Sequence, residues 1–284
     1  MIEPHARTLE LAGATLTYDV RQPASRSDEP ALLMIGAPMG SSGFTALTDR
    51  FADRPVVTYD PRGAGRSPRA DGVTAATPGE HADDLGRLIA ELDAAPVDIF
   101  ASSGGAVNGL ALVARSPELV RTLVAHEPPL ATVVPDREQA MAVTVDLHET
   151  YKRDGLGPAM AKFIAFTSVR GPTPADFLGR SPDPADFGLP GEDDGSRDDP
   201  MLGPHMVWSA GYEPDFDALR RASTRIVLAA GAASQDAFPY RAAVAVAERL
   251  GTEVVIFPSH HSGFGEQGEP DAFAATLRRV LAGG

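Results

Sequence analysis

Ser103 stands where a short apolar run meets a helical pattern, in the segment Val97-Asp-Ile-Phe-Ala-Ser-Ser103-Gly-Gly-Ala-Val. Strand, sharp turn and helix in this order are typical of a nucleophile elbow, G-x-S-x-G, with Ala101 in the place of the first glycine. The helix N-terminus behind the serine favours negative charge on reacting oxygens. We therefore expect Ser103 to attack a carbonyl carbon and the Gly104 N–H to bind the oxyanion. A Ser/Gly-rich turn without chemistry is the alternative.

A serine nucleophile needs a histidine base, and the base needs an orienting acid. In enzymes with such an elbow the chain order is serine, acid, histidine. The apolar run 253–257 leads into Pro258-Ser-His-His-Ser-Gly-Phe264, so the expected loop holds two neighbouring candidates. His260 and His261 compete, and the small residues before Phe264 favour His261 as the base.

Two acids fit the position between the serine and the histidine. Glu127 follows the predicted strand 120–125 and precedes two prolines, which would hold its carboxylate rigidly. Asp236 follows the predicted strand 225–230, the commoner position for the acid in such a fold. Spacing alone leaves Glu127 and Asp236 nearly even. On an extended chain His126 would point to the side opposite Glu127 and would be structural.

A glycine-rich loop follows another predicted strand, in Gly36-Ala-Pro-Met-Gly-Ser41. Such a loop is where the second oxyanion N–H is expected, and Ala37 is its best donor; an ordinary tight turn is the alternative. The segment Tyr59-Asp-Pro-Arg-Gly-Ala-Gly-Arg-Ser67 carries turn residues and an Asp–Arg pair, and we interpret it as structural.

These motifs require an alternation of strands and helices. Apolar runs predict strands at 16–20, 31–35, 55–59, 97–100, 120–125, 225–230 and 253–257, and helices begin at Pro78 or cover Gly104–Arg115, 239–250 and Pro270–Leu281. Residues 130–170 read as helical without strands, and 171–204 are rich in Pro, Gly and Asp. We predict an α/β core over 1–129 and 216–284, interrupted by a helical lid at 130–215 with a mobile loop at 171–204.

Composition excludes several other classes. The 284 residues include 39 acidic and 25 basic side chains, a formal net charge of −14, which disfavours nucleic acid and anionic membranes as partners. No cysteine is present, so thiolate metal sites and thiol nucleophiles are excluded. The first residues do not resemble a signal peptide and no apolar run is long enough to span a membrane, so a cytoplasmic location is expected.

Taken together, the motifs resemble the α/β-hydrolase superfamily, and the resemblance covers nearly the whole chain outside 171–204. Y-D-P-R-G-A-G-R-S is similar to the family's Y-D-x-R-G-x-G-x-S turn, A-S-S-G-G to its elbow, and F-P-S-H-H-S-G-F to its histidine loop. The α/β-hydrolase fold therefore implied has a mostly parallel sheet, helices on both faces and a helical lid.

A narrower resemblance is to zearalenone lactonase and its bacterial relatives. Their acid is a glutamate in an H-E-x-P segment, which His126-Glu127-Pro-Pro matches, so the resemblance favours Glu127 over Asp236. Their lid tryptophan contacts the lactone, and Trp208-Ser-Ala-Gly-Tyr212 resembles that segment. With Trp208, Met39 and Ser102 complete the expected substrate-binding residues. The lid differs from theirs in length and composition, so substrate identity does not carry over.

The expected activity is hydrolysis of a carboxylic ester or lactone, with a mid-sized apolar substrate, through an acyl-enzyme. No metal or organic cofactor is implied, the partner is the small-molecule substrate, and a homodimer is left open. The same residues could serve C–C bond hydrolysis or cofactor-free haloperoxidase chemistry. A ligand-binding protein that keeps the fold without catalysis is the alternative from a different class.

Overall fold

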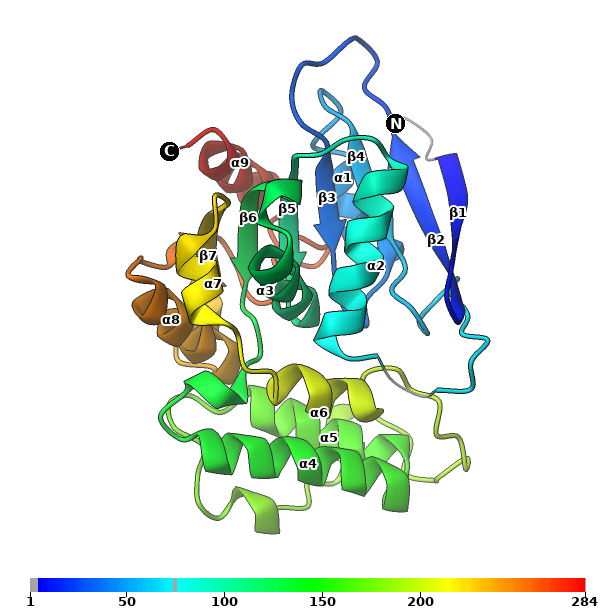
Figure 1. Cartoon of the computed structure of the whole chain (residues 1–284). Coiled ribbons are helices and arrows are strands. Elements are labelled where there is room, and N and C mark those ends of the chain that lie inside the picture. Colours follow the sequence, from blue (N-terminus) through cyan, green and yellow to red (C-terminus); the bar gives the residue numbers. More distant parts are fainter. Residues whose placement is uncertain (1–4, 74–75, 284) are drawn as a thin grey trace.

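The structure, a computed structural model, describes residues 5–73 and 76–283. Its centre is an eight-stranded sheet in the order β1-β2-β4-β3-β5-β6-β7-β8 (Figure 1). The strands are β1 (His5–Leu11), β2 (Ala14–Arg21), β3 (Leu32–Ile35), β4 (Val56–Tyr59), β5 (Val97–Ser102), β6 (Val120–His126), β7 (Arg225–Gly231) and β8 (Val255–Phe257). Strands β3 to β8 are parallel, whereas β2 is antiparallel to both β1 and β4. The predicted mostly parallel sheet is confirmed.

Helices cover both faces of the sheet, as predicted (Figure 1). They are α1 (Thr45–Thr48), α2 (Pro78–Glu91), α3 (Gly104–Arg115), α4 (Arg137–Asp154), α5 (Leu156–Thr167), α6 (Pro204–Ala210), α7 (Phe216–Arg221), α8 (Phe238–Leu250) and α9 (Pro270–Leu281). Apolar residues of α2, α3 and α8 share one core with the sheet. Those of α1 and α9 share a second core with its other face.

Strand β5, which leads to Ser103, is buried along its whole length because both faces of the sheet are covered there. Its single charged residue, Asp98, is fully buried and pairs with Arg54 and Arg121, each at 2.6 Å. Burial of this carboxylate is tolerated because two guanidinium groups compensate its lost hydration. The strand therefore enters the elbow as a rigid element.

Helices α4, α5 and α6 form a separate layer across one end of the sheet (Figure 1). The chain enters this layer after β6 and leaves it before β7, so the layer lies over the carboxyl ends of parallel strands. Open α/β sheets bind their ligands at those ends. Between α5 and α6, the segment 171–203 is irregular apart from short 3-10 turns at Phe177–Gly179 and Pro184–Phe187. The lid limits at 130 and 215 and the mobility of 171–204 stay predictions.

Strand β1 lies outside the sequence prediction. It forms a hairpin with β2 across Ala12 and Gly13, and Gly13 adopts φ +75°, which favours glycine at that position. Residues 1–4 lie outside the described residues; they belong to the N-terminal segment that we predicted not to be a signal peptide. Within the described part of the chain, no helix has both the length and the apolar character needed to cross a membrane.

Candidate active site

Ser103 occupies a strained turn between β5 and α3. Its φ of 57° and ψ of −128° are unusual for a residue with a side chain, and its N–H donates to the carbonyl of His126 at 3.0 Å. Non-glycine residues persist in such conformations where the surrounding structure over-determines them, and they gather at functional sites. The geometry is that of the predicted nucleophile elbow, with the serine at the carboxyl end of the sheet.

Close packing around the elbow explains its small residues. A Cβ on Gly105 would lie 2.4 Å from the carbonyl oxygen of Ile35, so only glycine fits there. Ala101, which replaces the first glycine of the motif, is fully buried, and a Cβ on Gly109 would lie 3.4 Å from its methyl group. The helix and the strand therefore pack closely, and the tightest neighbour of such a Cβ would be Leu123, at 2.8 Å.

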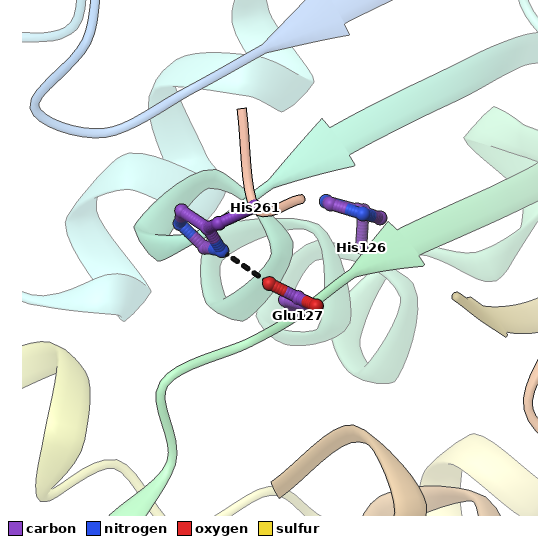
Figure 2. A group of neighbouring side chains, drawn as sticks. All are labelled: His126, Glu127 and His261. Carbon is purple, nitrogen blue, oxygen red and sulfur yellow. Dashed lines mark hydrogen bonds and ion pairs between the residues drawn. The ribbon is translucent and has the colours of Figure 1, made fainter. Parts of the chain in front are cut away.

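His261 and Glu127 form a hydrogen-bonded pair beside the elbow. Nδ1 of His261 lies 2.5 Å from Oε2 of Glu127, and the dashed line in Figure 2 marks this contact. The other carboxylate oxygen accepts the Gly231 N–H at 2.9 Å. Glu127 is fully buried, whereas the His261 side chain is 38% exposed. The carboxylate therefore holds one ring nitrogen and leaves the opposite side of the imidazole accessible.

The charge of Glu127 is stabilised despite its burial. Burial alone would raise its pKa, but the hydrogen bond from His261, the neighbouring imidazoles and the Gly231 amide hold the pKa below its usual value. A carboxylate that stays ionised at this depth can fix the tautomer of His261 and stabilise its protonated form.

Asp236, the alternative acid, is not brought to the histidine. Its side chain is exposed, and its backbone carbonyl accepts the Gly171 N–H at 2.8 Å. The structure pairs Glu127 with His261 because β6 lies beside β5, with His126 opposite Ser102 in the register. His260 is exposed, and its Nδ1 accepts the Ser262 N–H at 3.2 Å.

His126 is fully buried among four phenylalanine rings, those of Phe100, Phe257, Phe264 and Phe273. Burial lowers its pKa to about 4, with Glu127 opposing and His261 adding to the shift, so the ring is neutral near pH 7. His126, Glu127 and His261 each bring one metal-ligating atom within 4.8 Å of the others. The 2.5 Å hydrogen bond between Glu127 and His261 engages two of these three side chains with each other.

The loop of residues 36–41, expected to supply the second oxyanion donor and called the oxyanion loop below, lies against the elbow. A Cβ on Gly104 would sit only 2.4 Å from the carbonyl oxygen of Ala37, which shows how closely the two backbones approach. The loop is braced from below, because the Asp60 carboxylate accepts the Ser41 N–H at 2.8 Å and pairs with Arg66 at 2.8 Å. The Tyr59–Ser67 turn is structural in this sense, as expected.

A cavity of about 360 Å³ opens between the elbow and the lid helices. Ala37, Ser103, Gly104 and His261 line one wall, so the predicted reacting and oxyanion residues meet at one space. Much of the remaining wall is apolar, including Leu147, Phe163, Phe166, Met206 and Phe238. Among residues 5–73 and 76–283, no hydrogen bond joins the Ser103 hydroxyl to His261; catalytic contacts of this kind often tighten only when substrate binds.

The three expected substrate-binding residues do not line this cavity. Trp208 is on α6, but its side chain is 52% exposed, because a short helix presents only one face to the core. Ser102 is buried, and its hydroxyl faces Nδ1 of His126 at 3.5 Å, because alternate residues of a strand point to opposite faces. Met39, within the oxyanion loop, packs against the core. That these three residues contact substrate stays a prediction, which the described lining of this cavity does not support.

Two lid residues at the cavity were missed from the sequence. His205, on α6, reaches the backbone of Ala37, and its Nε2 lies 2.9 Å from where a Cβ of Gly104 would be. Its ring packs edge-on against His81, with centroids 5.6 Å apart. Arg170, just after α5, lines the cavity at its rim. Neither belongs to a motif, and only the position of the lid brings them to the site.

Comparison with known proteins agrees with this fold. The chain matches the model of the alpha/beta hydrolase fold over residues 30–264. It is 31% identical to the Bacillus subtilis (strain 168) protein named Uncharacterized hydrolase YraK over 265 residues, which cover 90% of this chain and 89% of YraK.

Solved structures with different activities share the fold. The enol-lactonase from Burkholderia xenovorans LB400 has a TM-score of 0.67 at 17% identity, covering 97% of this chain and all of its own. The proposed non-heme bromoperoxidase BpoC from Mycobacterium tuberculosis H37Rv has a TM-score of 0.64 at 21% identity, covering 94% of this chain and 96% of its own. Likeness at this identity is evidence of the fold alone. The family match, the relative and the sheet order lead to one conclusion: the chain belongs to the alpha/beta hydrolase family.

Proposed function

We propose that this hydrolase cleaves a carboxylic ester or lactone through an acyl-enzyme on Ser103. The observation that carries the proposal is the pairing of buried Glu127 with His261 at 2.5 Å, on the same cavity as the strained Ser103. A histidine oriented by a buried carboxylate beside a serine is the arrangement that activates a hydroxyl for attack on a carbonyl.

In the first half-reaction, the Ser103 oxygen bonds to the carbonyl carbon while Nε2 of His261 takes the hydroxyl proton. The carbonyl oxygen becomes an oxyanion, which the N–H groups of Gly104 and Ala37 bind; one such donor is worth about 3–4 kcal/mol in an analogous protease. The bond to the leaving oxygen then breaks, and His261 donates its proton to that oxygen. Glu127 stays ionised and stabilises the imidazolium throughout.

In the second half-reaction, a water molecule gives a proton to His261 and attacks the acyl carbon. The bond to Ser103 breaks, the proton returns to the serine oxygen, and a carboxylic acid leaves. A lactone substrate would release a single hydroxy acid, since its leaving oxygen and acyl group belong to one molecule.

The cavity supports a mid-sized substrate with an apolar body. Its volume of about 360 Å³ falls at the lower end of small-molecule sites, and the aromatic and aliphatic side chains from α5, α6 and α8 offer few hydrogen bonds. Apolar walls select substrates by shape and by area removed from water, whereas the polar groups concentrate near Ser103.

Turnover of an ester and lactone panel tests the proposal. We expect hydrolysis by the wild type, loss of at least about 10³-fold in kcat with Ser103→Ala, and little change with Ser102→Ala, the neighbouring serine that faces away from the cavity. C–C bond substrates and halide-dependent oxidation form separate arms, because the same residues could serve them. Equal activity of Ser103→Ala and wild type would refute the proposal, and ligand binding without any turnover would favour a non-catalytic binding protein.

A further inference from the structure

The cavity is electrically unlike the rest of the protein. The chain carries 39 acidic residues and a net charge of −14, yet among the described residues that line the cavity there is no aspartate or glutamate. Arg170 is the one permanently charged residue among the described residues that line it. Arg170 is exposed, and the permanent charge that a ligand meets among the described cavity residues is therefore positive in an otherwise acidic protein.

Arg170 has no carboxylate partner within ion-pair distance among residues 5–73 and 76–283, and its NH1 contacts only the carbonyls of Thr167 and Val169, at 3.1 and 3.4 Å. The arginines of the following loop behave differently. Arg180 and Arg197 each pair with the aspartate four residues earlier. The residue four positions before Arg170 is instead the apolar Phe166, which lines the cavity. N–H donors of the Arg170 guanidinium therefore stay available to a ligand.

His260 supplies a second donor nearby. Its Nδ1 accepts the Ser262 N–H at 3.2 Å, which places the hydrogen of the neutral ring on Nε2. The loop between β7 and α8 contacts the backbone next to both residues. The N–H of Gly171, which follows Arg170, donates to the carbonyl of Asp236, and the N–H of Ala233 donates to the carbonyl of Ser259, which precedes His260, at 2.8 Å. Arg170 and His260 both line the cavity, and the backbone next to each is hydrogen-bonded to this same loop.

We propose that Arg170, assisted by His260, binds a carboxylate that the substrate carries in addition to its scissile carbonyl. This inference rests on the proposed ester or lactone hydrolysis and names its substrate class: apolar esters or lactones that carry a second, acidic group. Charged hydrogen bonds from a guanidinium fork suit a carboxylate better than the neutral hydroxyl groups that also line the cavity. The exposed carboxylate of Asp236, on the same loop, is the competing anion.

Matched p-nitrophenyl esters provide the test. Heptanoate and the half-ester of adipic acid have similar lengths but differ in the terminal carboxylate; nonanoate and the half-ester of suberic acid form a longer pair. We expect the wild type to prefer one half-ester over its neutral match in kcat/KM. Arg170→Gln should lower that preference ratio about tenfold, mainly through KM, and Arg170→Lys should restore part of it. Arg180→Gln, on the same lid but paired with Asp176, is the control and should leave the ratio unchanged.

Calorimetric titration of Ser103→Ala with the same esters measures the subsite without turnover. There the added change Arg170→Gln should weaken binding of the preferred half-ester by a similar factor. A wild type without preference at either length, or a ratio that Arg170→Gln leaves unchanged, would overturn the subsite while leaving ester hydrolysis standing. If the proposed ester hydrolysis itself were wrong, turnover would be absent or would persist in Ser103→Ala. The titration would still show whether Arg170 binds the carboxylate.

Discussion

Replacing Glu127 with glutamine removes the charge behind His261 and keeps the size of the side chain. In the structure, Oε1 of Glu127 accepts the Gly231 N–H, whereas Oε2 faces Nδ1 of His261. A glutamine that keeps the bond to Gly231 must turn its NH2 group toward His261. That group donates to Nδ1, so the hydrogen of the neutral ring moves to Nε2, and the ring can no longer accept the proton of Ser103.

Two losses combine in this variant: the tautomer of His261 is wrong, and its imidazolium has lost its carboxylate partner. We expect kcat to fall about 10³- to 10⁴-fold, as for the corresponding change in a serine protease, which corresponds to about 4–5.5 kcal/mol. The matched control is Asp236→Asn, which alters an exposed carboxylate and should change kcat less than about twofold. Steady-state kinetics on one ester measure both, with circular dichroism to verify folding. A larger effect from Asp236→Asn than from Glu127→Gln would refute the assignment of the acid.

Three further outcomes follow from contacts around the site. Gly104→Ala should lower kcat/KM at least about 100-fold in a folded protein, because its Cβ would lie 2.4 Å from the Ala37 carbonyl oxygen and displace the oxyanion loop; near wild-type kinetics would contradict this. His205→Ala removes the lid imidazole that reaches the backbone of Ala37, and kcat should fall about tenfold with a smaller change in KM; a change in KM alone would place His205 in binding. Asp136→Asn should lower the free energy of unfolding by about 3 kcal/mol at pH 7, because the buried carboxylate pairs with Arg241 at 2.5 Å and ties α4 to α8. Burial alone would raise the pKa of Asp136, but Arg241 and its other hydrogen bonds hold the pKa well below its usual range. This stability is therefore fully present above that range and is lost as pH falls through the lowered pKa; urea titrations in which the destabilisation does not shrink between pH 7 and about pH 2 would contradict this.

The elbow and its histidine could be predicted from the sequence because each lies in one continuous segment. Ser103 follows its strand directly, and His261 lies in the loop after the last strand. The choice between Glu127 and Asp236 could not be made from spacing, since both follow a strand. It depends on which strand lies beside β5 and on the turn of the chain at Glu127, whose φ of 48° departs from the extended conformation assumed for that segment.

Side-chain directions on the lid were harder to predict. The resemblance to a lactonase family gave the position of Trp208 along the chain, but α6 is a short helix and its rotation depends on what it packs against. His205, three residues earlier on the same helix, faces the cavity instead. Strand β1 was also missed, although the alternation in HARTLEL and the glycine of the following tight turn are a hairpin signal.

Covalent labelling of Ser103 tests the central claim most directly. The wild type, Ser103→Ala and Ser102→Ala are each incubated with a fluorophosphonate, and intact masses are recorded before peptide mapping. An activated serine hydroxyl displaces fluoride from phosphorus, so we expect one adduct, mapped to Ser103, on the wild type and on Ser102→Ala, and none on Ser103→Ala. An adduct that persists in Ser103→Ala, or a folded wild type that hydrolyses esters yet takes no label, would contradict the account.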